Sequence, residues 1–252
     1  MSLVKFLQKR LRSIGYEVVP YPPSDWVRSR DSLQRLLNKL AIDCVFDVGA
    51  NRGQFGDQLR DVGYRGTILS FEPVEAHFKV LSERASARPP WKAFKYALGS
   101  QNGQAEINVN EDDVLTSFLP TTTGPTSTLP RNNVIAKETV EVRRLDSIFD
   151  DCMAGVGASR LYLKLDTQGF DLEALRGAEG VLDNFLGAQS EVSFIPIYHG
   201  MPTSLETIKE FQGRGFDVAD FMPVTRASDG LLMMEMDCMF ARNPQIRRES
   251  RI

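Results

Sequence analysis

The chain has 252 residues, of which 42% are hydrophobic and 25% charged, and its formal net charge is -3; this length allows one large domain or two small ones with a sizeable core. The charge gives no support for nucleic-acid binding, which usually shows as a clustered basic excess, and the lack of any run of about 18 apolar residues excludes a membrane-spanning helix. The three cysteines are odd in number and widely spaced, which argues against a disulfide framework or a zinc site and indicates a reducing, cytoplasmic setting.

The first residues predict an amphipathic helix and lack the features of a signal peptide. Apolar side chains repeat at helical spacing over residues 3–14, and cations occupy the rest of the circumference: Lys5, Lys9, Arg10 and Arg12. Such a helix either packs on the body of the protein with its cations in solvent, or makes a weak contact with an anionic membrane surface.

Helical and strand patterns then alternate along most of the chain. We expect helices at residues 30–42, 54–64, 75–86, 172–185 and 204–216. We expect strands at residues 44–50, 67–73, 91–99, 160–169 and 188–197, with further strands at 217–221 and 237–243. Strands separated by helices of this length form βαβ units, whose right-handed crossovers place helices on both faces of a parallel sheet. The pattern therefore predicts an α/β fold with a doubly wound sheet.

The alternation breaks between residues 100 and 159, which we interpret as an insertion. Residues 105–110 and 139–145 alternate apolar and polar side chains, as edge strands do. Between them, residues 119–133 contain three prolines, one glycine and six hydroxyl residues, a composition typical of a lid, a binding loop or disorder. No repeat and no linker is visible, so we predict a single domain over residues 1–252, with a helical extension at 1–40 and a catalytic core at 41–243.

The stretch CVFDVGANRGQF, residues 44–55, predicts a buried strand followed by a ligand-binding loop. Gly49 would allow a sharp turn, and Gly53 stands where the next helix begins. A dinucleotide fingerprint would have a glycine where Asn51 stands, and Asp47 argues against a neighbouring pyrophosphate. An acid at this point suits a cationic group such as an amine.

Glu72 ends the second predicted strand, in the sequence SFEP. A carboxylate at this place can accept both hydroxyls of a ribose, and Pro73 stiffens the turn that follows. A ligand with a ribose, an amine and little phosphate is S-adenosylmethionine. Two alternatives stay open: a tight turn with a solvent-facing Glu72, and an NAD(P)-dependent oxidoreductase, against which Asn51 counts.

Five motifs occur in order over residues 44–242: FDVGANRG, SFEP, ALG, VRRLDSI and LKLDTQGFDLEALRGAE. As an ordered series they resemble the FkbM family of S-adenosylmethionine-dependent methyltransferases. The resemblance implies a class I methyltransferase fold, which is Rossmann-like and has a seven-stranded sheet with an antiparallel last strand. It also implies O-methylation, since family members typically methylate hydroxyl groups, often of sugars or polyketide-type natural products.

The resemblance assigns roles to individual residues. The glycine loop would hold the methionine part of the cofactor, the SFEP segment the ribose, the end of the third strand the adenine, and the end of the fourth strand would face the methyl group. The residues expected around the cofactor are Asp47, Gly49, Ala50, Asn51, Gly53, Phe71, Glu72, Pro73, Ala97, Leu98 and Asp166.

A hydroxyl acceptor needs a base or a metal to remove its proton. Lys164 and Asp166 stand two apart and would share one face of the fourth strand; Lys164 would orient the acid, bind the acceptor, or only form a salt bridge. His199 follows the fifth strand in a turn and is either a proton acceptor or a turn residue bonded to the backbone. We expect Asp166 and His199 to share the acid–base work, with Lys164 beside them and Glu191 as a reserve candidate.

The chain departs from the family pattern at two positions. Gln168 stands where glutamate is common, and Asp171 replaces a second glutamate, so any role of that glutamate as a base or a metal ligand is weakened. No His-x-x-x-His pair or carboxylate set specifies a metal, and none is predicted. His77 is expected to be a surface or packing residue of the second helix.

The acceptor is expected to be a sugar hydroxyl in a glycan, a glycolipid or a natural product. The loop over residues 119–133 would cover an elongated, hydroxyl-rich acceptor. A non-catalytic S-adenosylmethionine-binding protein stays open as an alternative, and the oligomeric state is left open, a homodimer included.

Overall fold

The computed structural model describes residues 25–122, 133–227 and 230–242. The predicted helix over residues 3–14 lies outside this range, as does most of the proline- and threonine-rich loop over residues 119–133. Within the described ranges, no helix is both long and apolar enough to cross a lipid bilayer.

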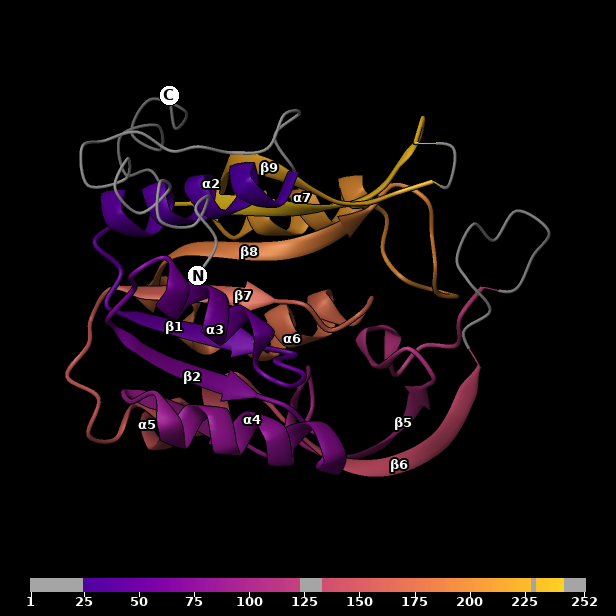
Figure 1. Ribbon diagram of the computed structural model, residues 1–252, viewed down its shortest axis with the longest axis horizontal. Helices are drawn as coiled ribbons and strands as arrows, with labels where there is room; N and C mark the ends of the chain where they lie inside the picture. Colours follow the sequence, from indigo (N-terminus) through magenta and orange to yellow (C-terminus); the bar gives the residue numbers. More distant parts are fainter. Residues whose placement is uncertain (1–24, 123–132, 228–229, 243–252) are drawn as a thin grey trace, which may run out of the picture.

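Helices and strands alternate in the first third of the chain as the sequence predicts (Figure 1). These elements are α2 (Asp25–Lys39), β1 (Cys44–Val48), α3 (Gln54–Asp61), β2 (Thr67–Phe71), α4 (Glu75–Ala87) and β3 (Trp91–Phe94). The second alternating stretch consists of β7 (Leu161–Leu165), α6 (Asp171–Gly177), β8 (Phe185–Ser193), α7 (Ser204–Gly213), β9 (Asp217–Arg226) and β10 (Met233–Ala241). The helix predicted at 172–185 is shorter, because a 3-10 helix, η2 (Glu179–Asn184), follows α6.

The main sheet has seven strands in the order β3-β2-β1-β7-β8-β10-β9. Its first five strands pair in parallel, whereas β10 pairs antiparallel with both β8 and β9. The predicted class I methyltransferase fold with an antiparallel last strand is therefore confirmed. The insertion of β10 between β8 and β9 places Asp237 directly opposite Glu191 in the register.

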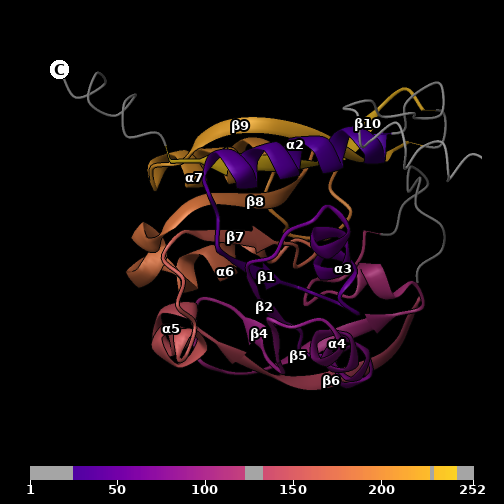
Figure 2. The same ribbon diagram turned by 60° about the vertical axis from the view of Figure 1, so that its left-hand side comes forward.

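Helices cover both faces of this sheet, as the βαβ pattern predicts. α2, α3 and α4 pack on one face, and Figure 2 shows α2 lying along β9. α5, α6 and α7 pack on the other face, around a cluster that includes Phe46 and Phe185. β1 and β7 are buried along their whole length, which explains why their sequences are almost continuously apolar.

The insertion forms a second, three-stranded sheet in the order β4-β6-β5. Its elements are β4 (Ala97–Leu98), β5 (Gly103–Asn110), η1 (Asp113–Leu115), β6 (Val134–Arg143) and α5 (Leu145–Met153). The two predicted edge strands are β5 and β6, which pair antiparallel.

Two sequence expectations in this region are corrected. The single strand predicted at 91–99 is two strands: β3 pairs with β2, but after Lys95 and Tyr96 the chain leaves the main sheet, and β4 pairs with β6. The helix α5 was not predicted, although Leu145, Ile148 and Cys152 follow a helical period and pack on the core.

Candidate functional site

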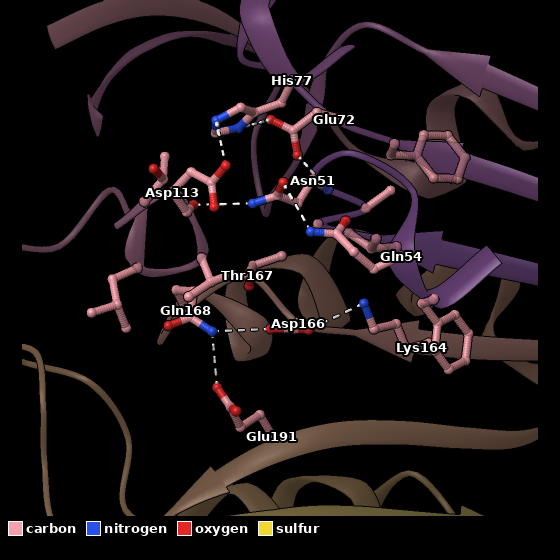
Figure 3. Close-up of a pocket in the computed structure, with 18 of the residues that line it drawn as sticks. Asn51, Gln54, Glu72, His77, Asp113, Lys164, Asp166, Thr167, Gln168 and Glu191 are labelled. Atoms are coloured by element: carbon pink, nitrogen blue, oxygen red, sulfur yellow. Dashed lines mark hydrogen bonds and ion pairs between the residues drawn. The ribbon is translucent and has the colours of Figure 1, made fainter. Parts of the chain in front are cut away.

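A cavity of about 470 Å³ lies at the carboxyl ends of β1, β2, β7 and β8 (Figure 3). Open α/β sheets bind ligands at this place, and the volume lies in the range of small-molecule sites. All the residues that the sequence placed around the cofactor line this cavity except Asp47 and Gly53. The predicted catalytic residues Lys164 and Asp166 line it as well, but His199 does not.

The loop after β1 passes tightly against the end of β7. Gly49 has a φ of +75°, and a Cβ on it would stand 1.9 Å from the backbone oxygen of Asp166, so only glycine fits here. Asn51 also takes the left-handed conformation, with a φ of 47°, which asparagine tolerates better than most residues. This conformation aims the Asn51 backbone N–H at Glu72 Oε2, 2.9 Å away.

Glu72 is a buried, fixed carboxylate, with a residue exposure of 5%. Its Oε2 accepts from the Asn51 backbone N–H, and its Oε1 accepts from the Val74 backbone N–H at 2.9 Å. The alternative of a solvent-facing Glu72 in a tight turn is therefore wrong. Each oxygen keeps a further lone pair that a ligand hydroxyl can use.

The insertion closes this end of the cavity through η1. Asn51 Nδ2 donates to the backbone oxygen of Asp113 at 3.0 Å, and Arg52 Nε lies 2.7 Å from Asp113 Oδ2. His77 is buried between the two acids, with Nδ1 3.6 Å from Glu72 Oε1 and Nε2 4.0 Å from Asp113 Oδ2. His77 thus lines the cavity, a position that the sequence did not indicate, because a histidine in an amphipathic helix gives no sign of what it faces.

Asp47 does not face the cavity, and the assignment of this residue to the cofactor amine is corrected. Its side chain is fully buried, where Oδ1 lies 3.1 Å from Lys164 Nζ and Oδ2 accepts from Ser70 Oγ at 3.0 Å. Ser70 Oγ in turn accepts from Trp91 Nε1 at 2.9 Å. This chain of contacts fixes Lys164 from behind the cavity wall.

Gly53 also has a structural position rather than a ligand-binding one. Its φ is +90°, and a Cβ there would meet Leu81 Cδ1 at 3.0 Å and the Trp91 ring at 3.1 Å. The glycine therefore lets α3 begin close against α4 and β3.

Lys164 joins Asp47 to the cavity acid Asp166. Its Nζ lies 3.2 Å from Asp166 Oδ2 and also lies over the Phe55 ring, 5.0 Å from the centroid. Burial lowers the pKa of Lys164, but the charges and hydrogen bonds of Asp166 and Asp47 outweigh burial and leave the pKa raised. Lys164 is a permanent cation that orients Asp166, which was one of the roles considered for it.

Gln168 connects Asp166 to the next strand. Its Nε2 donates to Asp166 Oδ1 at 3.1 Å and to Glu191 Oε2 at 3.0 Å (Figure 3). Its Oε1 accepts from the Tyr198 hydroxyl at 2.8 Å, and the residue has a φ of 54°. Because a side-chain amide can both donate and accept, Gln168 holds two carboxylates at once, which a glutamate could not do while ionised.

Carboxylates also line the wall beyond Gln168. Glu191, Glu235 and Asp237 all face the cavity. Burial raises the pKa of Asp237 to about 7, with Asp166 adding to the effect. Burial, followed by the charges of Asp166, Glu235 and Asp237, raises the pKa of Glu191 well above its ordinary value.

A sequence pattern indicates the shared face of these acids, but of the three only Glu191 was predicted as a candidate. In AQSEVS the longer polar residues Gln189 and Glu191 alternate with smaller ones, and in MEMDCMF Glu235 and Asp237 alternate with apolar ones. Alternation of this kind places Gln189 and Glu191, and also Glu235 and Asp237, on one face of the sheet. What the sequence could not show is that β10 lies beside β8.

His199 lies away from this group. It is exposed, and its backbone N–H donates to the Pro120 carbonyl at 2.9 Å. The preceding residue, Tyr198, is the one whose side chain is buried toward Gln168. The structure therefore does not bring His199 to Asp166, and the expectation that the two share acid–base work has no geometric basis.

No group of three or more His, Cys, Asp or Glu side chains within the described ranges is arranged to hold a metal ion. Four carboxylates do gather around the acceptor side of the cavity, yet each already has an ion pair or a hydrogen bond to a protein group. What the arrangement offers is a set of hydrogen-bond acceptors and one or more groups that can take a proton near neutral pH.

A family model described as "Methyltransferase FkbM domain" matches residues 47–218. No curated protein matches the chain. Among solved structures, the methyltransferase domain of bacterial CtHen1-CN has a TM-score of 0.45 at 11% identity, with 84% of this chain and 97% of that chain covered.

Two further structures are similar in fold. Magnesium protoporphyrin IX methyltransferase from Synechocystis PCC 6803, solved with bound S-adenosylmethionine, has a TM-score of 0.45 at 12% identity over 96% of this chain and 92% of that chain. Fibrillarin from Aeropyrum pernix, in complex with S-adenosyl-L-methionine, has a TM-score of 0.42 at 11% identity over 79% of this chain and 66% of that chain. At these identities the likeness concerns the fold alone.

Proposed function

The chain belongs to the FkbM family of methyltransferases, which use S-adenosylmethionine, and on that premise we propose that it methylates a hydroxyl group of a sugar. The sugar would belong to a glycan, a glycolipid or a natural product. The observation that carries the proposal is the composition of the cavity, which suits a nucleoside at one end and a hydroxyl-rich molecule at the other.

The donor end fits a nucleoside with an amino acid attached. Glu72 holds its two oxygens in place through two backbone N–H groups and would accept the ribose hydroxyls. Ala97 and Leu98 are apolar cavity residues on β4 and would contact the adenine. When bound, S-adenosylmethionine supplies a methyl group on a positively charged sulfur, which a hydroxyl oxygen can attack directly.

The acceptor end is rich in oxygen atoms that accept hydrogen bonds. Gln189, Glu191, Glu235 and Asp237 line it, together with Thr225. Among the described residues of this wall, Lys164 is the only cation, and it already pairs with Asp47 and Asp166. Sugar hydroxyls can donate to such a wall, whereas a phosphate or a carboxylate on the acceptor would meet like charge. We therefore expect a neutral or a cationic acceptor.

The chain's own residues would act mainly by positioning. Lys164 and Gln168 fix Asp166 from opposite sides, and η1 covers the donor end through its contacts with Asn51 and Arg52. Alignment of the attacking oxygen with the methyl carbon can supply much of the rate enhancement, and a covered cavity keeps water from competing.

The test is a transfer assay with S-adenosylmethionine that carries a carbon-13 methyl group. Purified protein would be incubated with a panel of neutral, amino-bearing and uronic-acid methyl glycosides, and O-methyl signals would be sought by NMR along with S-adenosylhomocysteine release. We expect O-methyl products from neutral or amino-bearing glycosides and none from the uronic acids. N-methyl products alone, or transfer mainly to the anionic sugars, would contradict the proposal.

The same assay separates the alternatives. A non-catalytic S-adenosylmethionine-binding protein would bind the cofactor in a calorimeter and release no S-adenosylhomocysteine with any acceptor. An oxidoreductase would bind NAD(P), against which the Asn51 side chain counts, because a dinucleotide-binding loop has a glycine at this position.

A further inference from the structure

Glu191 is the cavity carboxylate that lies between the methyl-transfer end and the acceptor wall. It stands on β8, next to β7, which carries Asp166 at its end, and next to β10, which carries Asp237. Its Oε2 accepts from Gln168 Nε2 at 3.0 Å. Within the described ranges Glu191 forms no ion pair, unlike Asp166.

The surroundings of Glu191 are unusual for a structural residue. Asp237 stands directly opposite it in the β8–β10 register, where like charges destabilise a sheet. The other titratable groups that face it are Asp166 from the end of β7, Glu235 from β10, Asp171 from α6, and Tyr198. These acids outnumber the one ammonium group that the described residues place beside them, Lys164, which pairs with Asp166; a sheet that keeps so many acids together sacrifices stability, which is typical of a functional site.

The other candidate proton acceptors have partners of their own: Glu235 accepts from Ser193 Oγ at 3.2 Å, and Asp237 is hydrogen-bonded to Gln189. Lys164 is held as a cation by two carboxylates. Asp166 is paired with Lys164 and bonded to Gln168. His77 lies at the ribose end beside Glu72, and His199 is exposed outside the cavity.

We propose that Glu191 is the general base that takes the proton of the acceptor hydroxyl, and that Gln168 is the positioning residue that aims it. This assignment rests on the proposed function. The acceptor oxygen forms a bond to the methyl carbon while the carbon–sulfur bond breaks and its electron pair stays on sulfur; neutral S-adenosylhomocysteine leaves, and the hydroxyl proton moves to a Glu191 oxygen and then to solvent.

The acidic neighbours of Glu191 help to set the pH range in which it can accept a proton. Burial and the charges of Asp166, Glu235 and Asp237 raise the pKa of Glu191, and a base works best when its pKa lies near the operating pH. Because Asp237 contributes through its negative charge, removing that charge lowers the pKa of Glu191. The ionised, active form of Glu191 then persists to lower pH.

The first test compares Glu191→Gln with Glu83→Gln, a matched control on the exposed side of α4. With a glycoside found in the transfer assay, Glu191→Gln should lower turnover by about 10²- to 10⁴-fold, while S-adenosylhomocysteine affinity stays within about two-fold of wild type. Glu83→Gln should match wild type in both. A wild-type rate in Glu191→Gln would overturn the assignment of Glu191 and leave the proposed function intact, whereas a wild type that methylates nothing would contradict the proposed function.

The second test needs no acceptor. A carbon-13 NMR titration of the full chain would follow the Glu191 carboxyl, assigned by its loss in Glu191→Gln. We expect its midpoint to lie well above the ordinary glutamate value of about 4.3 and to move down in Asp237→Asn. A midpoint at the ordinary value, or no movement in Asp237→Asn, would overturn the assignment.

Discussion

The two ends of the cavity handle their acids in opposite ways. At the donor end, Glu72 accepts two backbone N–H groups and Asp113 pairs with Arg52. At the acceptor end, Glu191 and Asp237 face each other across neighbouring strands, and burial together with nearby acids raises the pKa of both. At the donor end the acids are compensated by backbone N–H groups and an arginine, whereas at the acceptor end Glu191 and Asp237 lie beside other acids.

This difference suits the donor end to binding the cofactor and the acceptor end to removing a proton. A carboxylate that is held by hydrogen bonds is rigid, which suits it to hold a ribose at low cost in conformational entropy. A carboxylate among like charges keeps an affinity for protons near neutral pH, which suits it to remove one.

Lys164→Met should have the largest effect, because Lys164 joins the buried Asp47 to the cavity acid Asp166. The substitution leaves the fully buried Asp47 without its cation, and breaking a buried pair on one side costs about 3–5 kcal/mol of unfolding free energy. Urea unfolding monitored by circular dichroism would measure the loss.

Two comparisons make the Lys164→Met result decisive. Lys95→Met removes an exposed partner of Glu75 and should leave the unfolding midpoint nearly unchanged. Adding Asp47→Asn to Lys164→Met should recover part of the loss. A destabilisation under about 1 kcal/mol would contradict a role for Lys164 in compensating the buried Asp47.

Gln168→Glu should make the acceptor end more acidic without touching the donor end. The new carboxylate cannot donate to Asp166 and Glu191 as the amide does, and its charge raises the pKa of Glu191. The acid limb of the kcat/KM profile should therefore move to higher pH, and turnover below the limb should fall by about 10-fold for each unit of the shift.

The neutral variant Gln168→Met separates charge from positioning in that experiment. It should lower kcat by loosening Glu191 and should move the acid limb upward by less than Gln168→Glu does, because it removes the donated hydrogen bond without adding a negative charge. An unshifted pH profile in Gln168→Glu would count against Glu191 as the titrating group.

Asp237→Asn should change how stability depends on pH. Burial raises the pKa of Asp237 from 3.8 to about 7, so the folded state binds this proton more tightly than the unfolded state, and stability is lost as pH rises between these values. Asp237→Asn should thus be more stable than wild type above pH 7, by about 1.4 kcal/mol for each pKa unit that is relieved.

The advantage of Asp237→Asn should shrink as the pH falls toward 4. Thermal unfolding at several pH values would measure it, with Asp183→Asn, whose side chain is fully exposed, as the control. A variant less stable than wild type at high pH would contradict a raised pKa for Asp237.

His199→Ala should have the smallest effect. Its side chain lies outside the cavity, so turnover should stay within about two-fold of wild type. Tyr198→Phe should cost more, because it removes the hydroxyl that donates to Gln168 Oε1. A rate loss in His199→Ala comparable to that in Glu191→Gln would restore the role first expected for this histidine.

The same contrast explains how much could be predicted from the sequence. The donor end is built from short contiguous motifs, in which Gly49, Asn51 and Glu72 stand at the ends of neighbouring parallel strands, so a strand count is enough to bring them together. Even there, the sequence could not tell that Asp47 points behind the wall toward Lys164, because one residue of register decides which face of the sheet a side chain takes.

The acceptor end depends on pairings that the sequence does not contain. Glu191 and Asp237 are far apart in the chain and meet only because β10 inserts antiparallel between β8 and β9. His199 seemed suitable for its chemistry and its place after a strand, but a turn residue has no fixed face, and Tyr198 took the inward position. Residue type predicts chemistry well only where the backbone direction is also known.

The most direct test of the division between the two ends is the affinity of three proteins for S-adenosylhomocysteine, measured by titration calorimetry at one pH: wild type, Glu72→Ala and Glu191→Gln. We expect Glu191→Gln to bind within about two-fold of wild type. Glu72→Ala should bind about 10²-fold more weakly or worse, since it loses charge-assisted hydrogen bonds worth about 1.5–3 kcal/mol each. Wild-type affinity in Glu72→Ala, or an equal loss in both variants, would contradict this division.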